Sequence, residues 1–234
     1  GGNYSGNGFN GTAAVIAKNS NLFFQSSMAI GGHGGESYSY LPIGYGGDGA
    51  PGIDLDHSYA ELFGMGDNII EGGWEGWGPG GDGVAASAVK AYDSEVVYSG
   101  YTYVTYYQPD FDLSYSTATE IAPDVPIIRV LGSGQMGDYI RPELHSMPDS
   151  GFVLFATTLP AVNKVGLMYA HLLLHPMILF PLVGGGIPAG GSIYYTFDLP
   201  NDPTLAGTPI LFQASFLLPG GYRYISTSAG FAIH

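Results

Sequence analysis

Two aspartates, Asp54 and Asp56, have the spacing of a reactive carboxylate pair. They alternate with Ile53 and Leu55 in the stretch Gly46 to Ser58, which reads GGDGAPGIDLDHS. Residues two apart in a strand point to the same face and lie roughly 7 Å apart. This separation suits the acid and base of an inverting glycoside hydrolase. The pair is the first candidate for acid–base chemistry in this chain.

A histidine lies in a second glycine-rich stretch, Gly32-His33-Gly34. The tripeptide resembles the histidine motif of the β-helical polygalacturonases, which also carry paired aspartates and a basic substrate-binding motif. That basic motif is missing here, and a single histidine in a glycine-rich corner is usually a tolerated turn residue. We therefore predict no catalytic residue and no enzyme, with a polysaccharide-active β-helix enzyme as the alternative.

Four aspartates, Asp48, Asp54, Asp56 and Asp82, lie in GGDG and DLD contexts. These contexts are similar to calcium-binding β-roll repeats, in which carboxylates and carbonyls of successive turns share an ion. The short repeat unit of a β-roll is not reproduced, and aspartates in turns also cap the backbone or face solvent. A structural calcium ion is the only cofactor that the sequence suggests.

Sequence motifs for serine hydrolases and for nucleotide-phosphate binding are absent. The sequence has no G-x-S-x-G elbow and no phosphate-binding G-x-x-x-x-G-K-[ST] loop. His145, His171 and His175 are expected to be packed or surface side chains. His171 and His175 have no acidic third ligand nearby, so we expect no zinc site.

Tyrosine and tryptophan provide the clearest surface signal. Tyr101 to Gln108 reads YTYVTYYQ, and as a strand it has aromatic side chains on both faces, which suits packing or binding. It is expected either to be a last strand layer covered by the C-terminal domain or to form an interface. Trp74, Trp77 and the tyrosines are also able to stack on sugar rings. The predicted interface residues are Tyr4, Phe9, Trp74, Trp77, Tyr101, Tyr103, Tyr106 and Tyr107.

The composition points away from nucleic acid and membranes. The 234 residues include 38 glycines and only 11% charged residues, and six basic against 20 acidic residues give a net charge of −14. This charge repels phosphate backbones and anionic membranes. The apolar stretch Gly166 to Val183 is interrupted by Pro176 and Pro181, so no membrane span is expected. Because cysteine is absent, disulfides and thiolate metal sites are excluded.

Three copies of a repeat organise the first half of the chain. Ser20, Ser58 and Ser94 are spaced by 38 and then 36 residues, and each lies five residues after a β-branched residue. Short strands that are too small to bury their own apolar faces are stabilised by stacking on copies of themselves. A parallel β-helix is therefore predicted. Superposition of the serines predicts two columns of side chains: Leu22, Ala60 and Val96, and Phe24, Leu62 and Tyr98.

The repeat also resembles a known group of proteins. GGDG, an alternating strand, an Asp/His/Asn-Ser corner, a second strand and renewed Gly-Gly resemble the glycine-rich parallel β-helix proteins predicted to be secreted by planctomycetes and myxobacteria. The resemblance covers roughly Gly8 to Gln108. In the second half, Ser192 to Asp198, LPNDPTLAG at Leu199 to Gly207 and Ile210 to Ser215 look like the C-terminal β-sandwich module of those proteins. The resemblance implies an extracellular setting.

A linker divides the chain. Glu120 to Pro126 holds two prolines and two acids, which is typical of a domain boundary. We predict a β-helix domain with an N-terminal arm at 1–119 and a β-sandwich or jelly-roll-like domain at 120–234, within an all-β fold. In the second domain the expected strands are Ile127 to Leu131, Phe152 to Thr157, Val165 to Tyr169, Met177 to Phe180, Ser192 to Leu199, Thr208 to Leu217 and Gly230 to His234.

These features predict a secreted structural protein that assembles with copies of itself through head-to-tail β-contacts into a filament or cell-surface structure. Strand donation by Gly1 to Phe9 is a second way to pair the open end of the repeats. Glycan binding or degradation on the repeat surface is the competing function, with polysaccharide as the partner. Because the chain opens with Gly-Gly inside a repeat-like pattern, we expect it to be mature or partial.

Overall fold

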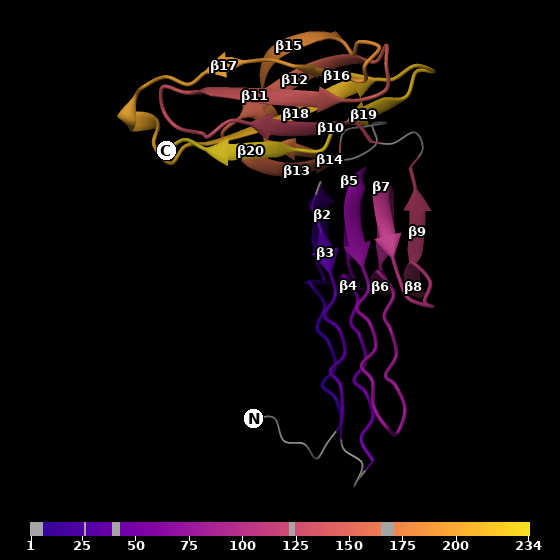
Figure 1. The fold of residues 1–234 in the computed structure, drawn as a ribbon. Coiled ribbons are helices and arrows are strands. Elements are labelled where there is room, and N and C mark those ends of the chain that lie inside the picture. The colour runs from indigo at the N-terminus through magenta and orange to yellow at the C-terminus, as the bar shows by residue number, and fades with distance from the viewer. Residues whose placement is uncertain (1–6, 26, 39–42, 122–124, 165–170) are drawn as a thin grey trace. The chain divides into compact units, whose positions relative to one another are not determined.

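The chain folds into two units, Gly1–Ile121 and Ala122–His234. The computed structural model describes residues 7–25, 27–38, 43–121, 125–164 and 171–234 (Figure 1). Over these residues the regular elements are strands, apart from two short 3-10 helices, η1 (Pro176–Ile178) and η2 (Pro203–Leu205). The predicted all-β class is confirmed. In the described part of the chain, no helix has the length and apolar character needed to cross a membrane.

Two parallel sheets form the strand part of unit 1. Sheet A contains, in order, β1 (Val15–Lys18), β4 (Ile53–Asp56), β6 (Val89–Tyr92) and β8 (Phe111–Ser114). Sheet B contains, in order, β2 (Asn21–Gln25), β5 (Tyr59–Glu71), β7 (Glu95–Val104) and β9 (Thr117–Glu120), and β3 (Ala29–Ile30) pairs with β5. Each sheet therefore takes one strand from each of four successive copies of the repeat.

The strand registers confirm the two predicted columns. Leu22 faces Ala60, and Ala60 faces Val96. The second column likewise brings Phe24, Leu62 and Tyr98 into register. Buried side chains from both sheets meet in one core, which includes Ile53, Leu55, Leu62, Ile70, Val89 and Val96. Burial of one such side chain contributes about 1.5–3 kcal/mol, so alternation of apolar residues specifies which face of each strand turns inward.

The parallel β-helix stays a prediction. In the described part of the chain, parallel pairing is confined to sheets A and B, while the other three sheets are antiparallel and do not belong to a solenoid. What the registers establish is parallel stacking of the repeat copies in unit 1.

Glycine-rich segments extend from these strands and appear in Figure 1 as the wavy traces that continue from β3, β4 and β6. They are 8–13, 31–37, 43–51, 72–78 and 80–87. Their backbone donors recur every three residues: Gly8 and Gly11 donate to the carbonyls of Tyr45 and Asp48 at 2.8 and 2.7 Å. Gly31, Gly34 and Ser37 donate in the same way to Glu71, Trp74 and Trp77. A three-residue period with bonds between segments is that of a polyproline II-type helix.

The segments form two layers whose close approach requires glycine. Between layers the bonds run antiparallel: Gly47 and Ala50 donate to the carbonyls of Gly35 and Gly32, both at 2.9 Å. A Cβ on Gly8 would lie 1.8 Å from the Gly35 carbonyl oxygen, and one on Gly34 would lie 1.9 Å from that of Gly47. No side chain fits in this space. The unusual glycine content therefore builds a backbone-to-backbone bundle.

Unit 2 consists of antiparallel strands. One sheet contains β10 (Ile127–Leu131), β11 (Tyr139–His145), β16 (Ser192–Tyr194) and β17 (Phe197–Asp198). The other contains β15 (Phe180–Gly186), β12 (Gly151–Thr157), β18 (Pro209–Leu217), β19 (Arg223–Ile225) and β20 (Ala229–Ala232). β13 (Pro160–Lys164) and β14 (His171–Leu174) form a hairpin pair. This arrangement is consistent with the predicted β-sandwich.

The strand predictions for unit 2 have mixed outcomes. Ile127 to Leu131 is confirmed as β10, and Thr208 to Leu217 corresponds to β18. The strand predicted at Met177 to Phe180 is wrong, because Pro176 begins the helical turn η1 there and β15 begins only at Phe180. Val165 to Tyr169 lies outside the described residues.

Candidate functional site

Each copy of the repeat turns a corner between sheet A and sheet B at a residue with positive φ. These residues are Asn19, His57, Asp93 and Tyr115, with φ of 48°, 50°, 44° and 54°. Asparagine, aspartate and histidine adopt this left-handed conformation more readily than other non-glycine residues. A serine follows at every corner, so the corner consists of a left-handed residue and a serine.

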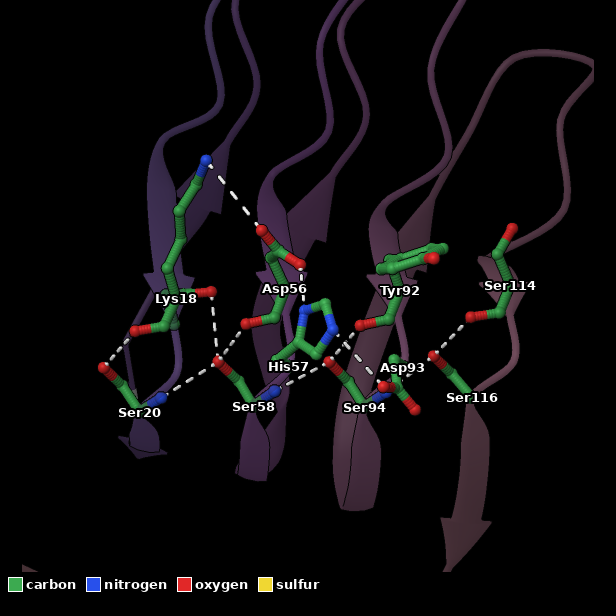
Figure 2. A network of polar contacts seen from close by, with 11 residues as sticks. Lys18, Ser20, Asp56, His57, Ser58, Tyr92, Asp93, Ser94, Ser114 and Ser116 are labelled. Carbon is green, nitrogen blue, oxygen red and sulfur yellow. Dashed lines mark hydrogen bonds and ion pairs between the residues drawn. The ribbon is translucent and has the colours of Figure 1, made fainter.

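The four serines form a ladder of hydrogen bonds (Figure 2). The backbone N–H of Ser20 donates to the hydroxyl oxygen of Ser58 at 3.2 Å, and that of Ser58 donates to Ser94 at 2.9 Å. Ser94 donates in turn to Ser116 at 2.9 Å. The ladder therefore runs in one direction through all four copies.

The hydroxyl groups of the ladder are bonded to the main chain. Each donates to the carbonyl oxygen two residues before it, at distances from 2.7 Å in Ser20 to 3.0 Å in Ser116. A serine nucleophile needs a base that accepts its proton, whereas these protons are held by the main chain. The serines satisfy backbone groups at the corner, where the regular sheet pairing is interrupted.

Charged side chains surround the second corner. His57 places Nδ1 2.6 Å from the Asp56 carboxylate and Nε2 3.3 Å from that of Asp93. Lys18 lies 4.0 Å from Asp56. His57 therefore bridges its own copy and the next one. All four side chains are substantially solvent-exposed, and ion pairs of this kind contribute about 0–1 kcal/mol.

A groove of about 670 Å³ lies along the corners, with Asn21, His57, Glu95 and Tyr115 among its lining residues. Tyr59 also lines it, and burial, together with the neighbouring Glu61, raises the pKa of this tyrosine far above its ordinary value. Tyr59 therefore stays protonated at neutral pH. Besides these hydrogen-bonding groups, the groove is lined by His57 and Asp93, with Nε2 of the histidine 3.3 Å from the aspartate carboxylate.

The four predicted calcium ligands have separate environments. A carboxylate oxygen of Asp48 accepts the N–H of Val84 at 2.9 Å, and one of Asp82 accepts the N–H of Gly78 at 3.4 Å. Asp54 and Asp56 share β4, and Asp56 contacts His57. Within the described residues no group of three or more His, Asp or Glu side chains is placed to hold a metal ion. The calcium site stays a prediction, to be tested by melting the protein with and without a chelator.

The predicted interface residues that the structure describes divide into three groups, of which two are exposed or packed as single side chains of unit 1. Tyr101 and Tyr103 pack against the core of unit 1. Burial raises the pKa of Tyr101 to about 12 and raises that of Tyr103 further. Phe9 and Tyr107 are exposed at 89% and 100%. Tyr4 lies outside the described residues.

The other three aromatic residues lie near the glycine-rich segments. Trp74 and Trp77 are each 45% exposed, and Tyr106 lies against Trp74 with a ring-centroid separation of 3.7 Å. His33 accepts the backbone N–H of Trp74 at its Nδ1 atom, at 2.9 Å. The histidine of the polygalacturonase-like tripeptide thus supports a tryptophan.

The histidines of unit 2 are distributed over different elements. His145 ends β11, with Nε2 3.3 Å from a carboxylate oxygen of Glu143. His171 begins β14 and faces Lys164 in the register, while His175 precedes η1. His171 and His175 thus lie on an extended segment and not on one helix, as expected from the sequence.

Among the described residues, strand edges without a paired neighbour lie at both ends of the repeat stack. β1 and β8 are the outer strands of sheet A, and β2 and β9 are outer strands of sheet B. At the first end, the Ser20 hydroxyl oxygen occupies the position that accepts an N–H from a preceding copy at the other corners. At the last end, the Ser116 N–H has no fifth serine to donate to in the described part of the chain. The ends therefore present opposite halves of the same bond.

The main chain repeats this complementarity. Asn19, His57 and Asp93 donate their N–H groups to the carbonyls of Asp56, Tyr92 and Ser114 in the next copy. Thr117 donates in the reverse direction to the carbonyl of Ser94. By the same pattern, the N–H of Tyr115 in the last copy and the carbonyl of Lys18 in the first copy both point outward from the stack.

Comparisons with known proteins do not assign the chain to a family. No family model and no curated protein matches it. Among solved structures it is similar to a superoxide reductase (neelaredoxin) from Ignicoccus hospitalis, with a TM-score of 0.32 and 8% identity over 47% of this chain and 80% of the other. It is also similar to the sporulation control protein Spo0M from Bacillus subtilis, with a TM-score of 0.22 and 12% identity over 47% and 48%. Likenesses at this level carry no argument about function.

Sequence reading missed the fourth corner and the glycine bundle. Ser116 lies only 22 residues after Ser94, so a search for spacings near 37 residues passes over it. The signal was the alternation in Phe111 to Ser114 followed by Tyr115-Ser116. This pattern matches the other copies except that the corner residue before the serine is a tyrosine and not Asn, His or Asp. The bundle was signalled by glycines three residues apart, as in Gly31-Gly34 and Gly73-Gly76.

Proposed function

We propose that this protein is a secreted structural subunit of an extracellular filament or cell-surface assembly, held together by head-to-tail β-contacts. In this proposal unit 1 is a short right-handed parallel β-helix whose two ends pair with the ends of neighbouring molecules. The single observation that supports it most is the one-directional serine ladder with its complementary open ends.

The ladder specifies which groups would meet at a junction. The N–H of Ser116 in one molecule would donate to the Ser20 hydroxyl oxygen of the next, as Ser94 does to Ser116 within the chain. The N–H of Tyr115 would donate to the carbonyl of Lys18, and the N–H of Asn21 to the carbonyl of Ser116, in the pattern of the inner copies. All three bonds repeat geometry already present in the chain.

A contact of this kind uses two different surfaces of the same protein. A pair of molecules joined by such a heterologous contact still has one free surface of each kind. Further molecules therefore add, and a filament forms when the rotation between neighbours does not close a ring. Open strand edges are otherwise sites that proteins protect with charges or prolines. The first edge strand, β1, carries both Ile16, which is 59% exposed, and the exposed Lys18, so an apolar contact point lies beside a charged one.

The test uses two edge variants of the full chain. In parallel pairing, alternate residues direct their N–H groups to opposite neighbours. Since Tyr59 donates to the Ser20 carbonyl and Thr117 to the Ser94 carbonyl, the N–H groups of Asn21 and Ala118 point outward. Asn21→Pro blocks the first end and Ala118→Pro blocks the last end, and proline is tolerated where an edge N–H faces outward.

The expected results are distinct for each sample. Wild-type protein forms polymers that are seen by electron microscopy and that sediment as large species. Each variant alone stays monomeric, and a mixture of the two forms dimers, because each variant retains one competent end. Asn201→Pro, at an exposed loop position in unit 2, polymerises like wild type. Monomeric wild-type protein at high concentration, or polymers that persist in both edge variants, would overturn the proposal.

A further inference from the structure

Five aromatic side chains lie in two contacting groups, one around Trp74 and one around Trp77, beside the glycine-rich segments 31–37 and 72–78. We call this surface the aromatic row, and its members are His33, Tyr38, Trp74, Trp77 and Tyr106. His33 and Tyr106 contact Trp74, and Tyr38 contacts Trp77. Both indole rings remain 45% exposed. The row is not used by the proposed head-to-tail contact, which involves the corners.

The spacing of the two indoles follows from the helix that carries them. Residues three apart in a polyproline II helix lie on the same side, about 9 Å apart along the axis. Trp74 and Trp77 are three residues apart on segment 72–78, and their carbonyls accept from the N–H groups of Gly34 and Ser37 in the neighbouring segment. The distance is close to the length of two pyranose rings in an extended β-1,4-linked chain, in which every second ring presents the same face.

The rings are held in place before any ligand binds. The backbone N–H of Trp74 donates to Nδ1 of His33 at 2.9 Å. The centroid of the Trp74 ring lies 3.7 Å from that of Tyr106, and the His33 ring lies edge-on to Trp74 at 6.2 Å. The Trp77 ring lies 6.0 Å from that of Tyr38. Binding to a rigid surface avoids the cost of ordering side chains.

Hydrogen-bonding groups lie beside the rings. Because Nδ1 of His33 accepts the Trp74 N–H, a neutral His33 ring carries its proton on Nε2 and has one donor left. The hydroxyl of Tyr38 is bonded to the Glu36 carboxylate. Aromatic faces with a few fixed polar groups suit sugar rings, which have apolar C–H faces and hydroxyl rims.

The surroundings favour sugar over protein as the occupant. Protein interfaces place their aromatic anchors inside a wider apolar patch that excludes water. Between Trp74 and Trp77 the segment has only Glu75 and Gly76, so the indoles are separate contact points. The net charge of −14 also disfavours acidic polymers.

We propose that the aromatic row binds a neutral polysaccharide of extended, β-1,4-linked pyranose sugars. Trp74 and Trp77 stack on sugar rings two units apart, and His33 and Tyr38 provide hydrogen bonds at the rim. An assembly subunit with this row would attach to a glycan matrix through unit 1.

Tryptophan fluorescence reports on this site directly, since Trp74 and Trp77 are the only tryptophans in the chain. Cellohexaose and chitohexaose are titrated into the full chain, with oligogalacturonate as the acidic comparison. We expect a saturable change with at least one neutral hexasaccharide and weaker binding of oligogalacturonate. Trp77→Ala should weaken binding about tenfold or more, which Trp74 still reports, and Trp77→Phe should restore part of it.

A matched control and the opposite outcomes complete the test. Tyr139→Ala removes a side chain of similar exposure, 49%, from unit 2, and it should leave the affinity unchanged. Circular dichroism verifies that each variant is folded. The proposal is overturned if neither neutral hexasaccharide binds at millimolar concentration, if folded Trp77→Ala binds as tightly as wild type, or if oligogalacturonate binds more tightly than both neutral probes.

Discussion

The backbone N–H of Ser58 donates to the hydroxyl oxygen of Ser94 at 2.9 Å, across 36 residues of sequence. Both serines are largely buried at the base of the groove, and this bond joins two copies of the repeat there. It explains why serine recurs at each corner: its hydroxyl accepts from the preceding copy while it donates to its own chain. Alanine or valine of similar size offers neither bond.

Loss of a serine hydroxyl should lower the stability of unit 1 by an amount that depends on the position of the serine in the ladder. Ser94→Ala leaves the N–H of Ser58 and the carbonyl of Tyr92 without this hydroxyl, and the loss should lower the free energy of unfolding of unit 1 by about 1–3 kcal/mol. Ser20→Ala is the control, because Ser20 is exposed at the first end and its hydroxyl donates to the Lys18 carbonyl two residues before it, within its own copy (Figure 2). Urea unfolding followed by tryptophan fluorescence measures both. Equal losses in the two variants would contradict a role for the ladder.

The glycine bundle predicts that an added methyl group disrupts unit 1. In Gly34→Ala the new Cβ would lie 1.9 Å from the Gly47 carbonyl oxygen, so the two layers must separate. The fluorescence of Trp74 and Trp77 should shift to the red as the bundle opens. Gly190→Ala adds the same group in unit 2, where nothing lies within 4 Å, and it should leave the spectrum unchanged. A native spectrum for Gly34→Ala would refute the close packing.

Buried tyrosines predict a loss of stability at high pH. An unfolded tyrosine ionises near pH 10, whereas burial raises the pKa of Tyr101 to about 12 and that of Tyr103 further. The folded chain therefore binds more protons than the unfolded chain above pH 10. The stability contribution is complete below pH 10 and is lost as pH rises through about 12. Unfolding of unit 1 should become easier over this range.

Two phenylalanine variants separate this effect from hydrogen bonding. Tyr103→Phe should reduce the pH dependence without loss of stability at neutral pH, because the Tyr103 hydroxyl is buried with no partner among the described residues. Tyr101→Phe should also reduce the dependence, but it removes the acceptor of the Ser27 N–H at 3.2 Å, at a cost of about 0.5–1.5 kcal/mol. Melting temperatures at pH 7, 10 and 11 compare them. An unchanged pH profile in both variants would show that other groups cause the alkaline transition.

A single buried glutamine should be essential to unit 2. Gln213 is fully buried, accepts the Leu173 N–H at 2.8 Å and donates to the carbonyls of His171 and Ser226, both at 2.9 Å. Gln213→Met keeps the length but leaves these groups unpaired, so unit 2 should lose about 2–4 kcal/mol. Hydrogen exchange at the Leu173 amide should accelerate accordingly. Gln135→Met, at an exposed position, serves as the control, and a slow Leu173 amide in Gln213→Met would contradict the assignment.

The sequence was sufficient for the parts of the fold that depend on local alternation. The alternation of Ile53 and Leu55 with Asp54 and Asp56 coincides with β4, and superposition of the serines predicted the columns of Leu22-Ala60-Val96 and Phe24-Leu62-Tyr98. These predictions succeed because burial acts on each strand separately and selects one face.

Only the tertiary structure decided how the recurring residues are used. The Ser58 and Ser94 hydroxyls, the His33 ring and the Asp48 carboxylate bond to backbone groups 36 to 41 residues away, and no local pattern encodes such a partner. Asp54 and Asp56 alternate like a catalytic pair, yet Asp56 contacts Lys18 and His57. Side-chain chemistry depends on neighbours that the stacking of copies brings together, so the strands follow from sequence alone and the bonds between copies do not.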